Sequence, residues 1–184
     1  DPENQEEIDN ANKLTGAIPT WLLELPADGG TPSWVKPDLA GTPPSKRSFH
    51  SCAPIVPSSA DVGQIAAVFG GLDTSGHHLN DLHLLHLAPA RPAAPSSAAC
   101  GALHYWVSIR QAGALPSPRG CALLVAPPQL GADAPLLVFG GSSEWSDEAG
   151  VTTYHADAYK VNLAPAIACL ARVAAGDLPA PAPV

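Results

Sequence analysis

A repeat written twice along the chain constrains its fold more than any other feature. Two apolar segments end in the same four residues, Val-Phe-Gly-Gly, first at Gly70-Gly71 and again at Gly140-Gly141. Each pair is followed by a loop, an Asp and a second apolar segment, NDLHLLHL (80–87) in the first copy and ADAYKVNL (156–163) in the second. The match indicates one structural unit used twice, and repeats of this length are typical of propellers and solenoids.

The match extends upstream of the glycine pairs. GTPPSKRSFHS (41–51) aligns with GALPSPRGCAL (113–123), which places Arg47 opposite Arg119 at an offset of 72 residues, and the same offset separates Trp34 from Trp106. Partial copies flank the two full ones. TWLLEL (20–25) is similar to LHLLHL and leads through a turn to Trp34, and CLARVAAGDLP (169–179) is similar to the opening of another unit, with Leu170 where the Trp would be.

Short apolar segments bounded by Gly, Pro and Asp predict four strands in each unit. We expect them at 48–56, 65–69, 81–87 and 104–110 in the first unit, and at 120–126, 136–139, 156–163 and 168–173 in the second. The many prolines (21) and glycines (16) agree with short strands and turns rather than long helices. Four antiparallel strands per repeat are typical of a β-propeller blade.

The pattern resembles the kelch repeat, in which an apolar strand ends in Gly-Gly and an aromatic, a Trp and a Pro-x-Arg segment follow. The resemblance covers about residues 20 to 180. His50 fits the family's His in the first copy, whereas Ala122 replaces it in the second, and the third-strand aromatic is Tyr159 in the second copy but Leu82 in the first. The positions that carry the signature are Trp34, Arg47, Gly70, Gly71, Trp106, Pro118, Arg119, Gly140, Gly141 and Tyr159.

This resemblance implies an all-β kelch propeller with four-stranded antiparallel blades and an incomplete ring in this chain. The expected organisation is a disordered or extended segment over 1–19 and a propeller segment over 20–184, with blades at about 47–110 and 119–173. An Ala/Pro-rich insertion at 88–102 has the composition of a solvated loop. Kelch rings have about six blades, and a free stack exposes its end faces, so we expect this chain to be part of a longer protein.

Candidate chemistry is sparse. Neither Gly-Gly pair has the further glycines, the lysine or the following helix of a phosphate-binding loop. His83 and His86 lie three apart on a predicted strand and should point to opposite faces, as outward polar positions, so we expect no metal site, and no G-x-S-x-G motif marks a nucleophile. We expect Arg47 and Arg119 to hydrogen-bond carbonyls of a neighbouring blade, and Trp34 and Trp106 to pack between blades.

Composition and charge limit the classes of partner that the chain can be expected to bind. The net charge of −8, with only nine basic residues, predicts no nucleic-acid binding, and no apolar run reaches the length of a membrane span. Four dispersed cysteines are interpreted as reduced thiols of a cytoplasmic protein, and the kelch resemblance adds a cytoskeletal or ciliary assembly as a further expectation.

Binding residues usually lie in loops on a rigid scaffold, and aromatic residues are enriched where partners bind. The loop candidates for partner contact are His77, His78, Trp145, Asp147 and Glu148, with Trp145 equally open to a role in packing its own loop. We therefore predict a non-catalytic protein-interaction scaffold without catalytic residues or cofactor. The alternative is the kelch region of an enzyme, either a metal-dependent propeller enzyme or a propeller attached to a catalytic domain such as a phosphatase.

Overall fold

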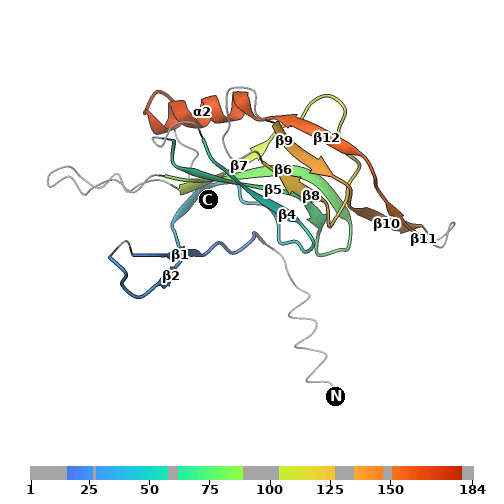
Figure 1. The fold of residues 1–184 in the computed structure, drawn as a ribbon, viewed down its shortest axis with the longest axis horizontal. Helices are drawn as coiled ribbons and strands as arrows, with labels where there is room; N and C mark the ends of the chain where they lie inside the picture. Colours follow the sequence, from blue (N-terminus) through green and yellow to red (C-terminus); the bar gives the residue numbers. More distant parts are fainter. Residues whose placement is uncertain are drawn as a thin grey trace, which may run out of the picture.

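A computed structural model describes residues 16–26, 28–57, 62–88, 104–126, 135–146 and 151–179 of the 184-residue chain. These residues form a mainly β structure with one helix and four small sheets, none of which closes on itself (Figure 1). Most of the predicted insertion at 88–102 lies outside the described residues. Of the predicted N-terminal segment, residues 16–19 are described and run extended, with Ala17 bridging Ser45.

The first unit consists of four consecutive antiparallel strands. They are β4 (Ser51–Ile55), β5 (Gln64–Leu72), β6 (His78–Leu87) and β7 (His104–Ile109), close to the predicted bounds. A short fifth strand, β3 (Leu39–Gly41), adds to β7 in parallel, which the sequence did not predict. This mixed five-stranded sheet is the largest in the described structure.

The second unit has three of its four predicted strands. They are β8 (Leu123–Val125), β9 (Pro135–Phe139) and β12 (Ala158–Asn162), paired antiparallel in the order β12-β9-β8. The loop after the second Gly-Gly forms a separate hairpin, β10 (Ser142–Ser146) with β11 (Val151–Tyr154), which projects away from the sheets in Figure 1.

The predicted fourth strand of the second unit, 168–173, is wrong. The segment is helix α2 (Ala164–Ala174), with a proline in its first turn and the left-handed Gly176 just beyond its end. Alanine and leucine favour helix, and proline suits a first turn. Leu170, which aligns with the tryptophan of the repeat, is nevertheless 3% exposed, so this position is part of the core although it lies on a helix and not on a strand.

A third, partial unit precedes the first. Strands β1 (Leu22–Glu24) and β2 (Ser33–Val35) form a hairpin in which Leu23 pairs with Trp34, and in the first unit Leu85 pairs with Trp106 in the same way. The hairpin therefore has the register of the third and fourth strands of a unit.

The two units pack sheet against sheet. We call the side of each unit that points toward the next unit its forward face, and the opposite side its rear face. The forward face of the first unit and the rear face of the second form one core. Its buried members from the first unit include Ala53, Ala67, Phe69, Leu82 and Leu84, and those from the second are Leu124, Leu136 and Val138. Helix α2 covers the β6–β7 part of the same forward face through Leu170, in the position along the chain where a fourth strand was expected.

Candidate functional site

Each unit contains an arginine clasp that joins its first segment to its glycine pair and its third strand. In the first unit, the Arg47 guanidinium donates to the Gly70 carbonyl at 3.0 Å and to both Asp81 carboxylate oxygens at 2.6 and 2.8 Å. Its Nε also donates to the Ser45 carbonyl at 3.0 Å. The arginine side chain is 1% exposed, and the Asp81 side chain is 39% exposed.

The second unit repeats this clasp group for group. Arg119 donates to the Gly140 carbonyl at 3.0 Å, to both carboxylate oxygens of Asp157 and, through Nε, to the Ser117 carbonyl. Both arginines are structural, as predicted, but the expected acceptors are wrong, because the side-chain bonds stay within their own unit. The sequence also missed the aspartates as partners of the arginines.

The clasps set the charge state of their aspartates. Burial alone would raise the pKa of Asp81, but hydrogen bonds from Arg47 and His83, together with the Arg47 charge, lower it well below its usual range. The pKa of Asp157 is lowered mainly by its hydrogen bond from Arg119. Both carboxylates are therefore ionised partners of a buried cation at neutral pH, and neither has the raised pKa expected of a general acid.

The Gly-Gly pairs are structural. Gly70 and Gly140 have φ of 61° and 64°, and Gly71 and Gly141 have 100° and 98°, values that favour glycine. A Cβ on Gly71 would lie 2.5 Å from the Ser48 carbonyl oxygen, and one on Gly141 would lie 2.7 Å from that of Gly120. That the glycine pairs do not form a phosphate-binding loop is predicted from the sequence. The structure shows why glycine stands at these positions, namely the positive φ and the close approach of neighbouring backbone atoms.

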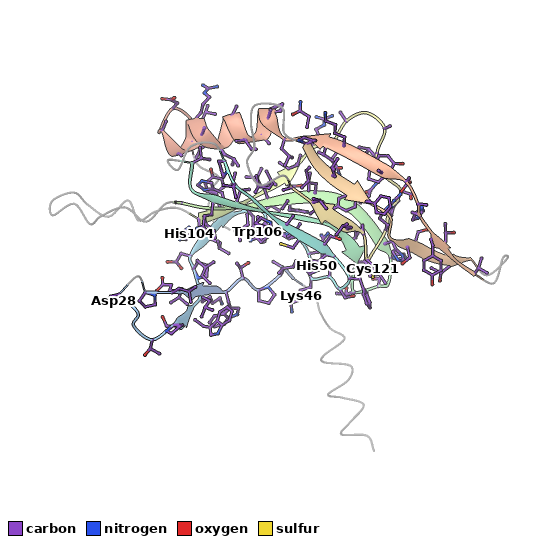
Figure 2. The ribbon with its side chains drawn as sticks, viewed as in Figure 1. Asp28, Lys46, His50, His104, Trp106 and Cys121 are labelled. Carbon is purple, nitrogen blue, oxygen red and sulfur yellow. The ribbon has the colours of Figure 1, made fainter. Side chains whose placement is uncertain are left out.

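Backbone hydrogen bonds between the segment before β8, which contains Arg119 and Cys121, and the first unit also join the two units. Gly71 donates to the Arg119 carbonyl at 2.9 Å, and the Arg119 amide donates to Leu79 at 2.9 Å. The Cys121 amide donates to the Phe49 carbonyl at 2.8 Å, and both Cys121 and the neighbouring His50 are labelled in Figure 2.

The outward placement predicted for His83 and His86 is wrong. His83 is 6% exposed, with Nε2 2.9 Å from Asp81, and His86 is 2% exposed, with Nε2 2.5 Å from the Val62 carbonyl oxygen. Strand register places His83 opposite Val68 as Tyr159 lies opposite Val138, so His83, not Leu82, matches the aromatic of the second copy. Tyr159 lies 5.5 Å from the Arg119 guanidinium carbon, and His83 in the same position bonds the clasp carboxylate instead.

The two tryptophans of the repeat have different environments. Trp106 is 4% exposed, packs with Val68 and Leu85 and donates to the Thr20 hydroxyl at 3.3 Å (Figure 2). Trp34 is 66% exposed and is not covered by another unit among the described residues, so the packing between blades predicted for it stays a prediction.

The loop candidates are divided between two places. His77 lies at the exposed tip of the first loop, where Asp73 accepts from the His77 amide at 2.9 Å and from the Ser75 amide at 2.8 Å. His78 begins β6 and is half-buried. Trp145 lies in β10 opposite Thr152, and Asp147 and Glu148 lie outside the described residues. The histidines thus follow the first glycine pair, and Trp145 follows the second.

Metal-ligand groupings of three or more His, Cys, Asp or Glu side chains are absent from the described residues. The described cysteines, Cys52, Cys121 and Cys169, are free and exposed. Within the same residues, no helix has the length and apolar character needed to cross a bilayer. A comparison of the chain with profiles of known protein families and with curated proteins finds no match.

Proposed function

We propose that this chain is part of a kelch-type β-propeller that acts as a non-catalytic protein-interaction module. The observation that carries the proposal is the repetition of three strands in the same register, together with the glycine pair and the arginine clasp, around a loop that differs between the two units. A scaffold that fixes its framework and varies its loops is the usual design of a binding module.

The exposed end faces support further units of the same kind. On the forward face of the first unit, Phe69 and Ala67 are 0% exposed, whereas Phe139 and Leu137 in the same positions of the second unit are 50% and 40% exposed. The rear face of the β1–β2 hairpin is similarly bare, with Trp34 at 66% where Trp106 is at 4%. These are the faces that a neighbouring unit covers within the array, so we infer that a ring of such units continues on both sides.

The β10–β11 hairpin is the proposed partner contact. It replaces the short loop of the first unit, it projects from the sheets (Figure 1), and its described side chains include Val151 at 53% and Tyr154 at 82% exposure. Exposed aliphatic and aromatic side chains on a projecting element suit a protein partner better than a small molecule.

A loop exchange tests this proposal. Residues 142–156 are replaced by the first unit's LDTSGHHLN (72–80), so that the second unit receives the loop its framework already accommodates elsewhere. Proximity labelling in source cells should lose specific neighbours with this variant, while circular dichroism of the purified protein stays unchanged. A double exchange, which also places residues 142–156 in the first unit in place of 72–80, keeps the length and net charge of the parent chain and is the matched control.

Two results would count against the interaction module. An unchanged set of labelled neighbours would reject the hairpin as the contact. Stoichiometric iron or copper in the purified protein would favour the metal-dependent enzyme instead.

A further inference from the structure

The β1–β2 hairpin corresponds to half of a unit. Its strands have the register of the third and fourth strands of the first unit, since Leu23 pairs with Trp34 as Leu85 pairs with Trp106. Among the described residues β1 pairs only with β2, whereas β6 of the first unit also pairs with the second strand, β5. The edge of β1 away from β2 is therefore open, and an open edge is a template for a further strand.

The hairpin also joins the first unit as the first unit joins the second. The Lys46 amide donates to the Gly16 carbonyl at 2.9 Å, and the Arg119 amide donates to the Leu79 carbonyl at 2.9 Å. In each case the chain at the clasp arginine donates to the segment that begins or precedes the third strand of the unit before. The hairpin thus takes the place of a preceding unit whose first two strands are absent from the described residues.

The rear face of the hairpin lacks the apolar contact that a second strand makes in the first unit. Leu85 and Trp106 are 7% and 4% exposed and pack with Val68 of β5. At the same positions of the hairpin, Leu23 is 45% exposed and Trp34 is 66% exposed. A strand added at the open edge would cover these side chains in the same way.

Trp21 lies at the position beside the clasp arginine in the full units. By strand register it matches His83 of the first unit and Tyr159 of the second, whose ring lies 5.5 Å from the Arg119 guanidinium carbon. Trp21 is 55% exposed, and tryptophan is the best aromatic partner of a guanidinium. The clasp aspartate, two residues earlier in both full units, is replaced by Pro19, so an arginine placed here would meet the indole and no carboxylate.

We propose that the open edge of β1 binds an antiparallel β-hairpin from a unit of the same repeat, and that an arginine of this hairpin stacks on Trp21. The incoming hairpin would resemble residues 41–71, with a valine opposite Trp21 as in both full units. Such a hairpin contains the carbonyl acceptors of its own arginine, because Arg47 donates to Ser45 and Gly70. Main-chain pairing would supply affinity, and the indole would select the arginine.

A synthetic peptide of residues 41–71 tests the proposal. The peptide, labelled with fluorescein at its amino end, is titrated with the purified chain under reducing conditions and followed by fluorescence anisotropy. We expect saturable binding, and about fivefold weaker binding when the peptide has Arg47→Gln. In the chain variant Trp21→Leu, which keeps an apolar side chain at this exposed position, the two peptides should bind equally. Hydroxyl-radical footprinting should show protection of Trp21 and Trp34 but not of Phe139.

A covalent version removes the entropic cost of capturing a free peptide. Residues 41–79 are placed directly ahead of Ile18, so that the added segment enters β1 in the register of the first unit. Footprinting should then show Trp21 and Trp34 protected relative to the parent. Failure of both formats, an undiminished effect of Arg47→Gln in Trp21→Leu, or protection of Phe139 in place of Trp21 would each overturn the proposal.

This inference rests on the proposed array of units, but its outcome is separable from that of the interaction module. The β1–β2 and β10–β11 hairpins lie at opposite ends of the described structure in Figure 1. The peptide titration reads the first hairpin, and the loop exchange reads the second. A failed titration with lost neighbours in the loop exchange would therefore reject only the strand site.

Discussion

The first glycine of each Gly-Gly pair offers a matched measurement of how tightly the two units are joined. Gly70 and Gly140 hold the same place in the repeat and nearly the same backbone angle, φ of 61° and 64°. They differ in what an added Cβ would meet. At Gly70 it would lie 2.5 Å from the Arg119 carbonyl oxygen and 3.0 Å from that of Leu79, whereas at Gly140 the nearest atom is the His155 carbonyl oxygen at 3.3 Å.

The expected costs follow from these distances. A left-handed alanine costs about 1–2 kcal/mol at either site, and this term is common to Gly70→Ala and Gly140→Ala. At Gly70 the overlapping oxygens belong to two backbone bonds of 2.9 Å, Gly71 to Arg119 and Arg119 to Leu79, which must stretch or break to admit the methyl group. At about 1 kcal/mol for each bond, we expect Gly70→Ala to destabilise by about 3–4 kcal/mol and Gly140→Ala by about 1–2 kcal/mol.

Urea unfolding followed by far-ultraviolet circular dichroism measures the difference, with the slope of each transition compared to the parent. A third variant, Gly76→Ala, isolates the backbone term, because Gly76 has φ of 84° and an added methyl group would meet nothing within 4 Å among the described residues. Should Gly70→Ala lose no more stability than Gly140→Ala, the close approach between the units would not contribute to stability, and the packing described above would be refuted.

Three further predictions use similar contrasts. Trp106→Ala should cost about 3–5 kcal/mol because its side chain is buried, whereas Trp34→Ala, at the same register but 66% exposed, should cost less than about 1 kcal/mol in thermal unfolding. Asp81→Asn should cost about 1–2 kcal/mol at pH 7, a value kept small by solvent because the Asp81 side chain is 39% exposed. The pKa of Asp81 is lower in the folded protein than its unfolded value of about 3.9, so the extra stability of the parent is present above that pH and is lost as the pH falls through the folded pKa. Urea unfolding at several pH values would contradict this if the difference in stability between parent and variant stayed constant. Tyr105→Phe should leave the free protein equally stable or more stable by about 1 kcal/mol, because it removes a hydroxyl without a partner among the described residues, and a clear loss in calorimetry would reveal a partner for that group.

The sequence predicted the strands best where apolar runs ended in fixed turns. The four strands of the first unit lie within a few residues of their expected positions. The expected end of the second strand at Gly-Gly is wrong, because β5 continues through Gly70 and Gly71 to Leu72 with a register shift at the pair. The error at 168–173 has a local cause, since alignment to the repeat was weighed above composition. Ala164–Ala174 begins with a proline in its first turn, is rich in alanine and is followed by Gly176, which together favour helix.

The buried histidines show what pattern alone could not supply. Alternation correctly placed His83 and His86 on opposite faces, but it could not show that both faces of β6 are covered. One face packs against the second unit and the other lies beside Trp106. A strand between two layers is buried on both sides, and then polar side chains must find partners, as these do with Asp81 and Val62.

The geometry of the clasp explains why the sequence predicted the repeated arginines but not the aspartates that bind them. Arg47 reaches Gly70 across 23 residues and Asp81 across 34, whereas Arg119 reaches Gly140 across 21 and Asp157 across 38. A fixed offset finds the arginines and tryptophans but not the aspartates, because the intervening loop differs in length. The same geometry therefore forms around loops of different length, since the clasp and the glycine pair together fix both ends of each loop. The chain can change that loop without changing the sheet beneath it, and this places the freedom to acquire a binding function in the segments after Gly71 and Gly141.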